Sequence, residues 1–131
     1  MIVLITVSAT LAAALHILIF YMESIAWTKP SVWKRFGIAT QEEAETTSKI
    51  AFNQGFYNLF LAIGALLGVI LYGSGVTGAG LALALFSVGS MLAASVVLVA
   101  TGKKYIRAAA IQGTFPLITV VLLLLNLSGT F

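Results

Sequence analysis

The stretch that decides the fold runs from Ile50 to Tyr72 and reads IAFNQGFYNLFLAIGALLGVILY. It contains no charged residue, and as an α-helix it can cross a hydrocarbon core of about 30 Å, which requires about 20 apolar residues. The rest of the chain has the same character, because 60% of its 131 residues are hydrophobic and only 8% are charged. A soluble domain carries about 25% charged residues. We therefore expect a helical protein whose main solvent is lipid.

Three further apolar stretches accompany this one and predict an all-α bundle of four transmembrane helices. We place the helices at about residues 2–23, 41–72, 76–100 and 106–127, in a single membrane domain that covers residues 1–131. The second helix reaches back to Gln41 because Thr40-Gln-Glu-Glu43 is a capping box, in which both side chains satisfy backbone donors. The first stretch lacks the basic start of a signal peptide and has too long an apolar run, so we expect it to be retained.

The basic residues predict the orientation of the bundle. All seven lie in the loops that follow the first and third helices, or near the start of the helix after each loop: Lys29, Lys34, Arg35, Lys49, Lys103, Lys104 and Arg107. These loops share one side, which the positive-inside rule assigns to the cytoplasm. We therefore expect a multi-pass protein of the plasma (inner) membrane, with both termini on the non-cytoplasmic side and a cytoplasmic loop at about residues 24–40. This topology explains the net charge of +3 without a nucleic-acid partner.

The few polar side chains within the spans are expected to converge at one depth. The first helix carries four residues on one face, spaced i, i+4, i+7 and i+11. The second and fourth helices contribute polar groups close to the same membrane boundary, because each residue adds only about 1.5 Å of depth. We expect a polar pocket in the cytoplasmic half, with these ligand-binding residues: His16, Phe20, Glu23, Trp27, Asn53, Gln54, Tyr57, Asn58, Gln112 and Pro116.

This polar layer permits three functions. The first is binding or transport of a small molecule in the pocket. The second is an intramembrane enzyme for a lipid-soluble substrate, with His16 and Glu23 as the candidate catalytic acid and base. The third is a structural or accessory protein in which the polar layer holds helices together. All three remain open at this stage.

The expected partners follow from the same composition. Membrane lipids and a small-molecule ligand are the first of them, and a homodimer is left open because Gly64 and Gly68 form a G-x-x-x-G step. A single histidine and the absence of cysteine argue against a metal site. We find no cofactor motif, so none is expected.

The run Asn53-Gln-Gly-Phe-Tyr-Asn58 and its continuation to Ala62 resemble the signature of a known family, domain of unknown function 1304. His16, the Tyr21-x-Glu23 step, Trp27, the Phe36-Gly37 pair and Gln112-Gly-x-x-Pro116 are also similar to its pattern. The resemblance spans essentially the whole chain. It implies a small four-helix bacterial membrane protein and names neither a substrate nor a reaction.

Overall fold

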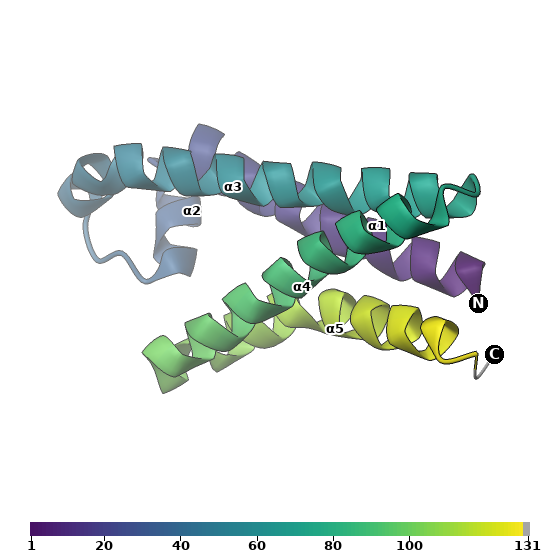
Figure 1. The fold of residues 1–131 in the computed structure, drawn as a ribbon. Coiled ribbons are helices and arrows are strands. Elements are labelled where there is room, and N and C mark those ends of the chain that lie inside the picture. The colour runs from purple at the N-terminus through teal and green to yellow at the C-terminus, as the bar shows by residue number, and fades with distance from the viewer. Residues whose placement is uncertain (130–131) are drawn as a thin grey trace. The chain divides into compact units, whose positions relative to one another are not determined.

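The computed structural model describes residues 1–129 and consists mainly of long helices (Figure 1). In chain order the elements are α1 (Ile2–Phe20), the π-helical turn η1 (Tyr21–Ile25), α2 (Pro30–Trp33), the 3-10 turn η2 (Lys34–Phe36), α3 (Gln41–Gly73), α4 (Thr77–Thr101), the 3-10 turn η3 (Lys103–Tyr105) and α5 (Ile106–Leu127). The short elements α2 and η2 occupy the segment that the sequence presents as a loop.

Four of these helical stretches are long and apolar enough to cross a membrane. They are Ile2–Ile25, Gln41–Gly73, Thr77–Thr101 and Lys103–Leu127. The predicted all-α fold with four candidate spans is therefore confirmed, and the chain has the character of a multi-pass membrane protein. The side on which each terminus lies stays a prediction.

Local side-chain bonds explain where α3 begins. The Thr40 hydroxyl accepts a hydrogen bond from the Glu43 N–H at 3.1 Å, as an N-cap residue does. The Glu43 carboxylate accepts from the Ala39 N–H at 3.0 Å, one residue earlier than the capping box predicts. The preceding turn ends at Gly37, whose φ of 78° lies in the left-handed region that favours glycine.

The chain divides into two compact units, which are described separately. The first unit comprises Met1–Leu15 and Leu61–Phe131, and the second comprises His16–Phe60. The first unit, described to residue 129, has an apolar core in which Ile5, Met91 and Leu123 are fully buried. In this unit α4 and α5 lie side by side (Figure 1).

Small residues bring the helices of the first unit into close contact. A Cβ atom added at Gly68 would lie 2.5 Å from the Ala84 nitrogen, so α3 and α4 approach backbone to backbone there. A Cβ at Gly64 would lie 2.3 Å from the Ser87 hydroxyl. Both glycines of the G-x-x-x-G step therefore pack within the chain, and intramolecular packing accounts for them without a second copy.

Two polar contacts join helices within the first unit. The Thr119 hydroxyl donates to the Ser8 hydroxyl at 2.9 Å and links α5 to α1. The Asn126 amide donates to the Tyr72 hydroxyl and links α5 to α3. Hydrogen bonds of this kind stabilise membrane helix pairs by about 0.6 kcal/mol on average.

Candidate functional site

The candidate site lies in the second unit, where α1 changes from an α-helix to the π-helical turn η1. The Ala26 N–H donates to the Tyr21 carbonyl at 2.9 Å, which is the i→i−5 bond of a π-helix. This turn carries Glu23 and Ser24. The π-turn ends the helix, because the backbone of Ala26 is no longer helical, and its wider turn places side chains differently from an α-helix.

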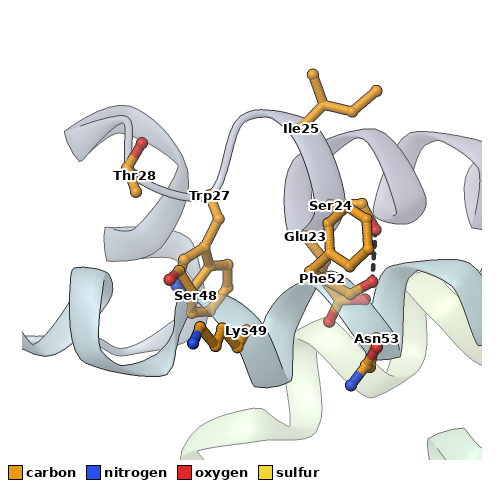
Figure 2. Close-up of a pocket in the computed structure, with 9 residues that line it drawn as sticks. All are labelled: Glu23, Ser24, Ile25, Trp27, Thr28, Ser48, Lys49, Phe52 and Asn53. Carbon is orange, nitrogen blue, oxygen red and sulfur yellow. Dashed lines mark hydrogen bonds between the residues drawn. The ribbon is translucent and has the colours of Figure 1, made fainter.

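A glycine of α3 allows this π-turn to pack closely. A Cβ at Gly55 would lie 2.0 Å from the Ser24 hydroxyl and 3.0 Å from the Ser24 nitrogen, so no larger residue fits without a shift. The Ser24 hydroxyl donates to the Phe52 carbonyl at 2.8 Å (Figure 2). One helical turn further along α3, the Phe56 ring meets the Phe20 ring edge to face, with centroids 5.1 Å apart.

The π-turn holds the Glu23 carboxylate in a buried position, with 8% of the residue exposed. Its oxygen Oε2 accepts a hydrogen bond from Nδ2 of Asn58 at 2.9 Å. The Asn58 amide nitrogen also donates to the Gln54 carbonyl of its own helix at 3.1 Å, which fixes the direction of the amide. The donor that orients this carboxylate is therefore a neutral amide. The carboxylate retains acceptor positions, because it offers about four lone-pair sites.

Beside Glu23 lies a pocket of about 480 Å³ (Figure 2). Its lining combines one carboxylate, one ammonium group, hydroxyl and amide groups and two aromatic rings. The residues are Glu23, Ser24, Ile25, Trp27, Thr28, Ser48, Lys49, Phe52 and Asn53. Pockets for small ligands typically measure about 300–1,000 Å³, so this volume suits a small molecule or a lipid headgroup.

The aromatic wall of the pocket is fixed by its own contacts. The Trp27 indole N–H donates to the Ala44 carbonyl at 2.9 Å and to the Thr47 hydroxyl at 3.3 Å. The Trp27 ring also packs against the Phe36 ring, with centroids 5.1 Å apart. The indole N–H is hydrogen-bonded and the indole ring is packed on Phe36, so these contacts within the chain fix the orientation of the wall.

The connecting segment beside the pocket is tied to the start of α3. The Trp33 indole N–H donates to Oε1 of Gln41 at 3.0 Å, and Nε2 of Gln41 donates to the Thr28 carbonyl at 3.2 Å. The Gln41 amide thus ties two points of the segment between η1 and α3, Thr28 near its start and Trp33 at its middle, to the first residue of α3. Thr28 lines the pocket, so these bonds help to set its rim.

The sequence pattern of the family described as "Protein of unknown function (DUF1304)" matches residues 10–124. The chain belongs to this family. The match confirms the resemblance seen in the Asn53–Asn58 run, and it includes every residue of the pocket. No curated protein and no solved structure matches the chain.

The structure gives the signature run of this DUF1304 protein distinct local roles. Gly55 admits the π-turn, Asn58 binds Glu23, and Asn53 lines the pocket. Gln54 and Tyr57 are instead exposed on α3, Tyr57 to 67%, and neither lines the pocket. The run therefore serves both to support Glu23 and to form part of the cavity.

The other residues predicted for the site fall into three groups. Glu23 and Trp27 line the pocket, and Phe20 packs behind it through its contact with Phe56. His16 is completely buried in the second unit and is not a lining residue. Gln112 and Pro116 belong to the first unit. A catalytic pair of His16 and Glu23 stays a prediction.

Sequence reasoning missed Ser48 and Lys49, which line the pocket from the part of α3 before the apolar run. A signal for Lys49 was present, since it precedes Asn53 by four residues and therefore shares its helix face. Phe52 follows Lys49 by three residues and shares the same signal, whereas Ser24 gave none, because its place depends on the π-turn. Among residues 1–129, no three His, Asp or Glu side chains come together as metal ligands.

Proposed function

We propose that this DUF1304 protein binds a small molecule with a polar group in the pocket beside Glu23. We further propose that it does so in the plasma (inner) membrane, with both termini outside the cytoplasm and the pocket on the cytoplasmic side. The orientation rests on the positions of all Lys and Arg residues, which lie between the first and second apolar runs or near the connection between the third and fourth.

The observation that carries the proposal is a buried carboxylate that lines a cavity and is oriented by a neutral amide. Burial of a charge is costly unless it is paired, and acidic groups within spans commonly mark ligand or ion sites. Glu23 has the Asn58 amide as a partner and the pocket on another side. A bound group that donates hydrogen bonds would complete the coordination of this carboxylate.

Binding fits these features better than the two other functions. A role in packing alone leaves the cavity beside Glu23 without a purpose. Acid–base catalysis by His16 and Glu23 requires both side chains at one cavity, and of the two only Glu23 lines the pocket. Transport requires a polar path, whereas the buried polar side chains described in the first unit are only the hydroxyl groups of Ser8, Ser87, Ser95 and Thr119. Transport would therefore need a second copy of the chain.

The test is native mass spectrometry of the protein purified in mild detergent, with Glu23→Gln as the variant. Glutamine has nearly the same shape and still accepts the hydrogen bond from Asn58, so the fold should survive while the charge is lost. The matched control is Glu42→Gln, which removes an exposed carboxylate outside the pocket.

We expect a retained small molecule or lipid on the wild type and on Glu42→Gln, and its loss from Glu23→Gln. The melting temperature of Glu23→Gln should hold or rise, because a buried charge kept for function is a cost to stability. Equal retention by all three proteins, or retention by none, would overturn the proposal.

A further inference from the structure

Resting on the proposed function, we infer that the pocket takes a zwitterion whose primary ammonium group meets Glu23 and whose phosphate meets Lys49. Phosphoethanolamine has this chemistry, either as the headgroup of a phospholipid or as a free molecule. The inference names the ligand class of the same pocket.

The first support is that two opposite charges line one cavity, while the hydrogen bond described for the carboxylate comes from Asn58 and not from the lysine. Glu23 comes from the π-turn and Lys49 from α3, and the Glu23 carboxylate is bound by Asn58. Figure 2 shows the Glu23 and Lys49 side chains apart from each other across the pocket. A ligand with one positive and one negative group can engage both, whereas a simple cation or anion engages only one.

The second support is the kind of cation that the carboxylate accepts. A primary ammonium group has three N–H donors, and a carboxylate is an acceptor for such donors. A quaternary ammonium group has no N–H and is typically bound by a cage of aromatic rings. Here the Trp27 ring is packed on Phe36 and its N–H is bonded to α3. The site is therefore better suited to ethanolamine than to choline.

The third support is the position of the pocket along the helices. Glu23 lies two residues before the end of the span Ile2–Ile25, and Lys49 directly precedes the uncharged run that begins at Ile50. Such positions correspond to the boundary between hydrocarbon and headgroups, where Lys side chains reach lipid phosphates. A phospholipid headgroup is present at that depth at high local concentration.

The experiment measures ligand binding to the detergent-solubilised full chain by native mass spectrometry. The probes are short-chain lipids with ethanolamine, choline and glycerol phosphate headgroups, together with free O-phosphoethanolamine. We expect the ethanolamine lipid to bind at least about tenfold more tightly than the other two, as one additional charge-assisted hydrogen bond predicts. Comparable binding of free O-phosphoethanolamine would identify the soluble molecule as the source, and its failure to bind would identify the lipid.

Two variants separate the two ends of the ligand. Glu23→Gln should abolish the preference for ethanolamine over glycerol while leaving the glycerol lipid bound as before. Lys49→Gln should weaken the binding of the ethanolamine lipid and of the glycerol lipid by the same factor, because both lipids carry the phosphate. Lys29→Gln is the matched control, since it removes an exposed lysine outside the pocket. It should change neither the affinity for the phosphate-containing lipids nor the preference for ethanolamine.

Two outcomes would overturn the inference. One is equal binding of the three headgroups to the wild type, and the other is a preference for ethanolamine that persists in Glu23→Gln. If the wild type retains a different co-purified molecule that Glu23→Gln loses, the proposed function stands and this ligand class is wrong. If Glu23→Gln loses nothing, the proposed function itself fails.

Discussion

Replacement of Gly55 by alanine tests the contact on which the geometry of the site depends. The new Cβ would lie 2.0 Å from the Ser24 hydroxyl, 3.0 Å from the Ser24 nitrogen and 3.1 Å from the Phe20 carbonyl oxygen. The hydroxyl can rotate away, but it then gives up its 2.8 Å hydrogen bond to the Phe52 carbonyl. The two backbone atoms can move only if the π-turn itself shifts.

The expected cost follows from three contributions. Overpacking at a tight contact costs about 1–3 kcal/mol. Loss of the Ser24 hydrogen bond adds about 1 kcal/mol. The higher helix propensity of alanine offsets about 1 kcal/mol. We therefore expect Gly55→Ala to lower the free energy of unfolding by about 1–3 kcal/mol.

The assay is equilibrium unfolding in mixed micelles with rising sodium dodecyl sulfate. Tryptophan fluorescence is a direct probe, because both tryptophans of the chain, Trp27 and Trp33, lie in the second unit. The matched control is Gly89→Ala in α4, where the added Cβ has no atom within 4 Å. Followed by circular dichroism, this control should be as stable as the wild type or more stable.

The same substitution in a Ser24→Ala background tests the contact directly. In Ser24→Ala the hydroxyl that approaches the new Cβ most closely is absent, so Gly55→Ala should cost about 1 kcal/mol less there than in the wild type. If Gly55→Ala is as stable as the wild type, or costs the same in both backgrounds, the close packing of the π-turn on α3 is refuted.

Three further changes test the fold and the pocket wall. Gly68→Ala should lower the free energy of unfolding more than Gly55→Ala, because its Cβ would lie 2.5 Å from the Ala84 backbone nitrogen, where no side chain can rotate away. The unfolding assay on the purified protein measures this loss, and a stability like that of Gly89→Ala would contradict the prediction. Trp27→Phe should lower the free energy of unfolding by about 1 kcal/mol or more, because the hydrogen bond of the indole N–H is lost. It should also weaken ligand retention in native mass spectrometry, and unchanged retention would exclude Trp27 as a wall of the site. Thr119→Val should cost only about 0.6 kcal/mol in the same unfolding assay, because the one bond between helices that it removes is that to Ser8 in α1, the other being to the Phe115 carbonyl of its own helix. A loss several times larger would contradict this estimate.

The sequence by itself determined the four long helices and approximately where they begin, but not the short helix α2 or the turns η1, η2 and η3. Whether a stretch such as Ile50 to Tyr72 can span a bilayer depends on its own length and polarity, which are local properties. The start of α3 at Gln41 was also readable, because an N-cap residue acts within one turn of its own helix. The family was recognisable from the Asn53–Asn58 run for the same reason, since the run is contiguous.

The candidate site was predictable only in part. Glu23, Trp27 and Asn53 were expected at a pocket and line one. The bond between Glu23 and Asn58 joins residues that were both selected, although nothing in the sequence paired them. Gln54 and Tyr57 were selected because they are polar or aromatic and close in sequence, yet they face outward on α3.

Only the tertiary structure decided which helix faces contact each other, because these contacts depend on how each helix is rotated about its own axis. An α-helix turns about 100° per residue, which would place Trp27 on the same face as His16, but the helix ends with the π-turn at Ile25 and Trp27 lies in the turn that follows. At Gly55 the backbone of α3 approaches that turn closely, since an added Cβ would lie 3.0 Å from the Ser24 nitrogen and 3.1 Å from the Phe20 carbonyl oxygen. Helical periodicity predicts neighbours within one helix, and small residues such as those of the G-x-x-x-G step indicate where a close approach can occur, but the sequence does not say which residue of another helix each of them meets.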